Sequence, residues 1–198
     1  MFDIKKETHS MDRNITPDKI LFFDMDGTLI DTNLANFLAY RKAIQSITKS
    51  EIELKFNPDC RFNRSNLKTV FPNLTEIEYE RITKEKERCY KDFLHETKLN
   101  NDFSEILFKY SETNRTYLVT NCRTDRAILT INHHRLKNKF TNLFCREIVE
   151  KDKKINKYQN AISKLGVSPK IIIAFEDEEC EIIDARKAGI TVINPINL

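Results

Sequence analysis

Residues 20–31 read Ile-Leu-Phe-Phe-Asp-Met-Asp-Gly-Thr-Leu-Ile-Asp. The first four have the length and composition of a buried parallel strand. Asp24 and Asp26 stand two residues apart at its end, and Gly27 lets the chain turn away. Such a pair can hold a hard cation such as Mg²⁺, or act as nucleophile and acid/base. An acidic turn is the simplest alternative, whereas an EF-hand loop is excluded because the twelfth position lacks Glu.

Composition narrows the class of protein. The chain has 198 residues, a length that favours one large domain or one domain with an insert. Its charged residues make up 32% of the chain but leave a net charge of only +3, which argues against a general nucleic-acid surface. No apolar segment approaches the roughly 18 residues that span a bilayer. Residues 1–18 lack the apolar core of a signal peptide. Five cysteines without a Cys-x-x-Cys pair indicate reduced thiols and a cytoplasmic protein.

Hydrophobic periodicity predicts alternating strands and helices. The predicted strands cover residues 19–26, 116–121, 143–149, 171–175 and 191–193. The predicted helices cover residues 33–50, 63–70, 75–99, 102–110, 125–139, 154–165 and 178–188. This alternation indicates an α/β fold with a parallel, Rossmann-like core sheet of about five strands.

One long helical stretch interrupts the alternation after the first strand. Residues 33–100 are too many for an ordinary crossover, so they predict an inserted α-helical cap domain. The catalytic core would then comprise residues 19–32 and 101–198. Residues 1–18 are expected to form a flexible N-terminal arm.

Polar residues follow three of the predicted strands. In open α/β sheets, ligands bind at the carboxyl ends of the strands, and these ends share one edge of a parallel sheet. The residues at those ends are Asp24 and Asp26, Thr120 and Asn121, and Glu176 and Asp177. The pattern alone therefore predicts a functional site at this edge.

The octet at residues 24–31 resembles the first motif of the haloacid dehalogenase superfamily, Asp-x-Asp-Gly-Thr-Leu-x-Asp. The resemblance extends over about residues 19–195. It implies that Asp24 is a nucleophile that forms an aspartyl-phosphate and that Asp26 is the general acid and base. Members that cleave carbon–halogen or carbon–phosphorus bonds usually lack the second carboxylate. Asp26 therefore favours phosphate-ester chemistry.

The same resemblance implies partners for the phosphoryl group. Thr120 would hydrogen-bond it, with Asn121 beside it as a substrate-binding residue; from the residues alone, helix capping is the alternative. The family also needs a lysine, and its frequent Lys-Pro-x-Pro sequence is missing here. Lys154 has the best spacing to the following helix, and Lys157 is the second choice.

Residues 175–178, Phe-Glu-Asp-Glu, resemble the family's metal-binding Phe-Glu-Asp-Ser motif. The resemblance implies a Mg²⁺ site made by Asp24, the backbone carbonyl of Asp26, Asp177 and Glu176. Glu178 departs from the motif, because serine is common there. It would either shift the affinity for metal or cap the next helix.

The predicted cap resembles that of the β-phosphoglucomutase and phosphoglycolate phosphatase branch. Arg64 lies where that branch carries its specificity loop, and could bind a second anionic group of a substrate. A solvated arginine before a helix is an equal alternative. Lys86 and Arg88 are weaker candidates.

These features predict a Mg²⁺-dependent phosphatase that acts on a small phosphomonoester through an aspartyl-phosphate. A phosphomutase with the same nucleophile is the alternative in the same class. A binding or regulatory protein that retains the fold is the alternative in another class. The expected partners are the small-molecule substrate and neither nucleic acid nor membrane, and the expected state is a monomer or weak dimer.

Overall fold

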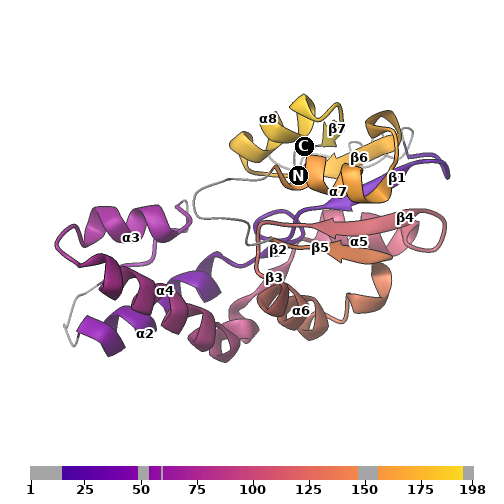
Figure 1. Ribbon diagram of the computed structural model, residues 1–198. Coiled ribbons are helices and arrows are strands. Elements are labelled where there is room, and N and C mark those ends of the chain that lie inside the picture. Colours follow the sequence, from indigo (N-terminus) through magenta and orange to yellow (C-terminus); the bar gives the residue numbers. More distant parts are fainter. Residues whose placement is uncertain (1–14, 49–53, 59, 147–155, 194–198) are drawn as a thin grey trace, which may run out of the picture. The chain divides into compact units, whose positions relative to one another are not determined.

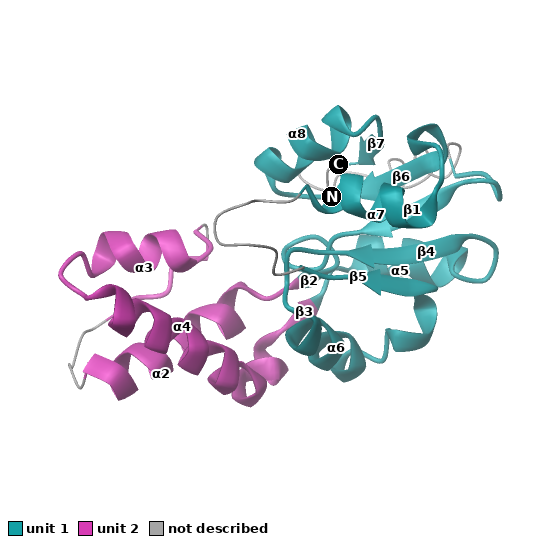
Figure 2. Ribbon diagram, viewed as in Figure 1, with its two compact units in different colours: residues 1–30, 99–198 teal, residues 31–98 magenta. Residues whose placement is uncertain are grey.

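The computed structural model describes residues 15–48, 54–58, 60–146 and 156–193. The chain divides into two compact units (Figure 2). Unit 1 comprises residues 1–30 and 99–198, and unit 2 comprises residues 31–98. None of the helices in the described ranges is long and apolar enough to cross a lipid bilayer.

Unit 1 is built on a five-stranded sheet (Figure 1). Its strands are β1 (Ile20–Phe23), β4 (Arg115–Val119), β5 (Asn142–Phe144), β6 (Ile172–Phe175) and β7 (Thr191–Ile193). Their order is β5-β4-β1-β6-β7, and every neighbouring pair is parallel. The predicted Rossmann-like parallel sheet is therefore confirmed. Because β1 is central, the residues after it adjoin the ends of both β4 and β6.

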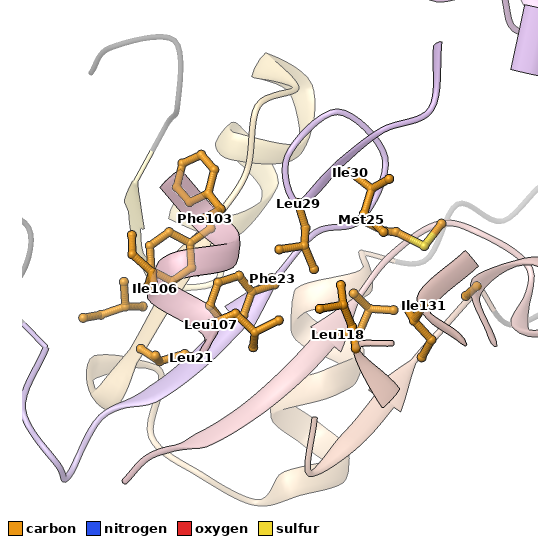
Figure 3. Close-up of a cluster of buried hydrophobic side chains, with 14 of the residues drawn as sticks. Leu21, Phe23, Met25, Leu29, Ile30, Phe103, Ile106, Leu107, Leu118 and Ile131 are labelled. Atoms are coloured by element: carbon orange, nitrogen blue, oxygen red, sulfur yellow. The ribbon is translucent and has the colours of Figure 1, made fainter. Parts of the chain in front are cut away.

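Helices cover both faces of this sheet. α5 (Asn101–Tyr110) and α6 (Thr124–His133) contribute to one apolar cluster, and α7 (Lys157–Leu165) and α8 (Glu179–Lys187) to the other. Figure 3 shows side chains of the first cluster, among them Leu21, Phe23, Met25, Leu29, Ile30, Phe103, Ile106, Leu107, Leu118 and Ile131. Full burial of one such side chain contributes roughly 1.5–3 kcal/mol, so β1 is firmly held by packing on both faces.

Residues 15–18 belong to the predicted N-terminal arm, residues 1–18, but they contact the folded unit. Ile15 is buried and packs into the first apolar cluster. The side chain of Asn114 donates to the carbonyl oxygens of Thr16 and Lys19, at 2.8 and 3.0 Å. Residues 15–18 are therefore tied to the sheet, and residues 1–14 lie outside the described ranges.

Two predicted helices end early. The helix expected over 75–99 begins as α4 (Glu76–Cys89), with a capping box formed by Thr75 and Glu78, and continues as a 3₁₀ helix, η1 (Tyr90–Glu96). The helix expected over 125–139 ends at His133 because Arg135 takes a left-handed conformation, with φ of 58°.

Helix α7 begins later than the sequence predicted. Its N-cap is Asn156, which has an extended conformation and accepts hydrogen bonds from the backbone N–H groups of Tyr158 and Gln159. The first helical residue is therefore Lys157. Lys154, the favoured candidate, lies outside the described residues.

Unit 2 is helical. α2 (Asn33–Thr48) packs against α4 and η1, and α3 (Arg64–Val70) starts at an N-cap and capping box formed by Asn63. The apolar residues between α2, α3 and α4 include Tyr40, Ala43, Ile44, Leu67, Tyr79 and Ile82. The short strands β2 (Ile30–Asp31) and β3 (Lys98–Leu99) pair where the chain passes between the units.

Candidate active site

Asp24 lies directly beyond β1 at the carboxyl edge of the sheet. Its backbone N–H donates to the carbonyl of Phe175 at 3.0 Å, so the strand register continues through this residue. Met25 turns its side chain into the core, so Asp24 and Asp26 project from the opposite side. Gly27 then turns the chain with φ of 95°, a conformation that a side chain would strain.

The side chain of Lys157 joins two buried carboxylates. Its Nζ lies 2.7 Å from Asp24 Oδ1 and 2.7 Å from Glu176 Oε2. Although burial opposes its charge, the two carboxylates outweigh that effect and raise the pKa of Lys157 above its usual range. Lys157 is therefore a cation at the centre of the acidic cluster, on the first residue of α7.

Glu176 has hydrogen-bond donors at both of its oxygens. Oε1 accepts from the backbone N–H groups of Asp177 and Glu178, each at 3.1 Å. Oε2 accepts from Lys157 and from the hydroxyl of Tyr158, at 2.7 and 2.6 Å. A carboxylate offers about four acceptor positions, so these four contacts use its capacity.

A group of three carboxylates could hold a metal ion. Asp24, Glu176 and Asp177 each offer an oxygen, and these oxygens lie within 4.8 Å of one another. Asp177 is fixed by the hydroxyl of Thr28, which donates to Oδ1 at 2.7 Å. An all-oxygen, anionic set of this kind suits a hard cation such as Mg²⁺.

The acidic cluster carries more negative charge than Lys157 offsets. Burial, then the charge of Glu176 and to a smaller extent that of Asp26, raises the pKa of Asp24 to about 7, against the opposing effect of Lys157. A divalent cation here would favour the ionised form of Asp24. The electrostatics thus agree with the geometry of the three carboxylates.

Asp26 is paired with an arginine that the sequence analysis did not single out. Arg126 Nη2 lies 3.1 Å from Asp26 Oδ2, and each side chain is only 14% exposed. Arg126 also places Nε 2.8 Å from the sulfur of Cys122. The available signal was position, because residue 126 falls in the first turn of the helix that follows Thr120 and Asn121.

Thr120 lies at the end of β4, as the sequence predicted, and is buried. Its backbone N–H donates to the carbonyl of Phe144 at 2.9 Å, and its Oγ1 accepts from the backbone N–H of Cys122 at 3.2 Å. It does not cap α6, whose N-cap is Arg123. Asn121 beside it is exposed.

The sequence from residue 21 to residue 194 matches the pattern that defines the haloacid dehalogenase-like hydrolases. The chain belongs to this family. The fold and the hydrolase class expected from the octet at residues 24–31 are thereby confirmed. No curated protein is significantly similar to this hydrolase in sequence.

Several solved structures share the fold of this haloacid dehalogenase-like hydrolase. One is a predicted phosphoglycolate phosphatase of Haemophilus somnus, with 20% identity, a TM-score of 0.72, and 91% of this chain and 86% of that chain covered. CbbY of Rhodobacter sphaeroides, crystallised with phosphate, has 15% identity, a TM-score of 0.72, and 89% and 85% coverage. A Thermotoga maritima protein provisionally named β-phosphoglucomutase has 23% identity, a TM-score of 0.62, and 89% and 84% coverage.

The structure of this hydrolase brings together Asp24, Lys157, Glu176 and Asp177. In unit 2, Arg64 is exposed at the first residue of α3. Lys86, by contrast, is buried 5.3 Å from the ring centroids of both Tyr40 and Tyr90. A role for either residue in binding substrate remains a prediction.

Proposed function

We propose that this hydrolase is a phosphatase that uses Asp24 as its nucleophile on a small phosphomonoester. The observation that carries the proposal is the buried contact of Asp24 with Lys157, next to Asp26 and the three-carboxylate group. A structural role alone would not explain several buried acids gathered around one lysine, because burying charges is costly.

In the first step a carboxylate oxygen of Asp24 attacks phosphorus, and the bond from phosphorus to the ester oxygen breaks. Asp26 gives that oxygen a proton, so the alcohol leaves and an aspartyl-phosphate remains. In the second step Asp26 takes a proton from water, and the water oxygen attacks phosphorus. Inorganic phosphate leaves, and the Asp24 carboxylate is restored.

Lys157 and Thr120 would bind the phosphoryl group. Lys157 already contacts Asp24, and its ammonium carries three donors, so it can offset the charge of an incoming phosphate. The hydroxyl oxygen of Thr120 accepts a hydrogen bond from the backbone N–H of Cys122, and the hydroxyl proton can be donated to a phosphoryl oxygen. We therefore assign the phosphate-site lysine to Lys157 in preference to Lys154.

The donor set fits Mg²⁺, which we propose as the cofactor. Asp24, Asp177 and the backbone carbonyl of Asp26 would be its ligands. When bound, Mg²⁺ reduces the repulsion between the Asp24 carboxylate and the phosphate. Glu176 is expected to contribute less, because its oxygens are engaged by Lys157, Tyr158 and two backbone N–H groups.

We further propose that unit 2, residues 31–98, acts as a cap that contributes specificity through Arg64. A second candidate function is a phosphomutase, because the Thermotoga maritima structure carries that name. Release of inorganic phosphate from a sugar phosphate, without formation of its isomer, would distinguish the phosphatase.

The decisive experiment measures hydrolysis of p-nitrophenyl phosphate and acetyl phosphate with Mg²⁺ and with excess chelator. The wild type should release phosphate only with the metal. Asp24→Asn should lose activity by at least about a thousandfold while retaining its fold, because the amide is not an anionic nucleophile. Wild-type turnover by a pure, folded Asp24→Asn sample would contradict the proposed mechanism.

A further inference from the structure

Arg126 connects the acid/base carboxylate to the loop that carries Thr120. Nη2 of its guanidinium donates to Asp26 Oδ2 at 3.1 Å. Nε of the same group lies 2.8 Å from Cys122 Sγ, and the backbone N–H of Cys122 donates to the hydroxyl of Thr120. One side chain on α6 thus links residues at the ends of β1 and β4.

A neighbouring arginine shows what an ordinary surface pair looks like here. Arg123 pairs with Asp125 at 3.0 Å, and these side chains are 51% and 65% exposed. The Arg126–Asp26 pair is only 14% exposed on each side and joins residues 100 positions apart. Burying such a pair is costly and adds little to stability. Its position next to the candidate site therefore points to a role in the reaction.

We propose that Arg126 is a positioning residue for Asp26. It fixes the orientation of the carboxyl group by holding Oδ2. A carboxyl group can accept a hydrogen bond at one oxygen while it carries its proton on the other, so this contact is compatible with proton donation to the leaving oxygen. The inference rests on the proposed phosphatase function, because that function gives Asp26 its role.

This role predicts a dependence on the leaving group. p-Nitrophenolate leaves without help from an acid, whereas the alkoxide of glycerol 2-phosphate needs a proton from Asp26. Arg126→Gln should therefore lower kcat for glycerol 2-phosphate by about 10–100-fold and kcat for p-nitrophenyl phosphate by much less. Arg126→Lys, which keeps a donor and the charge, should recover part of the loss.

The matched control is Arg123→Gln, three residues away, which should leave both rates unchanged. A double variant tests whether Arg126 acts through Asp26. In an Asp26→Asn background, Arg126→Gln should add no further loss with glycerol 2-phosphate, because the group that it positions is already inactive. Circular dichroism and thermal melting of every variant report on folding.

Three results would overturn the assignment. Equal losses on both esters, or losses that add to those of Asp26→Asn, would show that Arg126 binds the phosphoryl group or supports the fold. An Arg126→Gln enzyme as active as Arg123→Gln would show that the contact has no role. If the wild type hydrolyses neither ester, the proposed function itself fails, and that failure is seen before any variant is compared.

Discussion

Lys157 in unit 1 and Arg64 in unit 2 are two candidate substrate-binding cations in very different surroundings. In unit 1, Lys157 contacts both Asp24 and Glu176, and the parallel register of β1 and β6 fixes where those acids lie. In unit 2, Arg64 is an exposed residue on the first turn of a seven-residue helix. The first arrangement couples charge to folding, whereas the second leaves Arg64 free to change at little cost in stability.

The strongest test of this contrast removes the central cation of unit 1. Lys157→Met should lower the free energy of unfolding by about 3–5 kcal/mol in metal-free buffer, because two buried carboxylates lose their partner. It should also remove phosphatase activity. Urea denaturation and p-nitrophenyl phosphate hydrolysis would measure both effects.

Lys154→Met serves as the comparison for this variant. If Lys154→Met abolishes activity and Lys157→Met does not, the first choice made from the sequence was right and the assignment to Lys157 is wrong. The opposite result would support the position of Lys157 at the first residue of α7.

The next test measures how stability depends on pH. The pKa of Asp24 is about 7 in the folded chain and about 4 in an unfolded one, so folding favours its protonated form. The stability that this proton contributes is complete below pH ~4 and is lost as the pH rises through about 7. In chelator, the stability of Asp24→Asn relative to the wild type should therefore increase by up to about 3 kcal/mol between pH 5 and pH 8.

Denaturant titrations of both proteins across that range would measure the difference. Added Mg²⁺ at pH 8 should stabilise the wild type and have little effect on Asp24→Asn, which lacks one anionic ligand. A stability difference that stays constant with pH would mean that Asp24 is ionised without cost in the folded protein.

The two carboxylates after β6 should differ in their effect on metal binding. Asp177→Asn should raise the Mg²⁺ concentration for half-maximal activity by about 10–100-fold, because it weakens a direct ligand. Glu176→Gln should shift that concentration less and reduce kcat instead, because Glu176 holds Lys157 and Tyr158. Calorimetric titration with Mg²⁺ alone gives a readout without turnover. If both variants raised the Mg²⁺ concentration for half-maximal activity equally, Glu176 would be a direct metal ligand like Asp177.

The part of the site that could be predicted from the sequence is the part set by strand register. Asp24, Thr120 and Glu176 each follow an apolar run, and parallel strands bring such ends to one edge. The lysine was harder, because its position depends on where α7 starts. Spacing favoured Lys154, which lies outside the described residues, whereas the Asn156 N-cap makes Lys157 the first residue of α7 and supports our proposal of Lys157.

Arg126 could not be predicted for a related reason. It acts through a long side chain that reaches from the first turn of α6 to Asp26, 100 residues earlier. A sequence pattern gives the face on which a residue lies, but not which of several nearby carboxylates its guanidinium contacts. Arg123, equally basic and three residues earlier, pairs with Asp125 instead.

The smallest expected effect concerns Arg64 in unit 2. If unit 2 contributes specificity, Arg64→Ala should raise KM by about tenfold for a phosphomonoester with a second anionic group, since a charged hydrogen bond contributes about 1.5–3 kcal/mol. Acetyl phosphate, which lacks such a group, should be hydrolysed normally.

Phosphoglycolate, which carries a carboxylate, is a suitable probe, with Arg81→Ala on α4 as an exposed control in the same unit. Because Arg64 is exposed, its loss should not change the melting temperature. An equal effect on both substrates, or the same effect from Arg81→Ala, would assign specificity to other residues, with the buried Lys86 as the next to test.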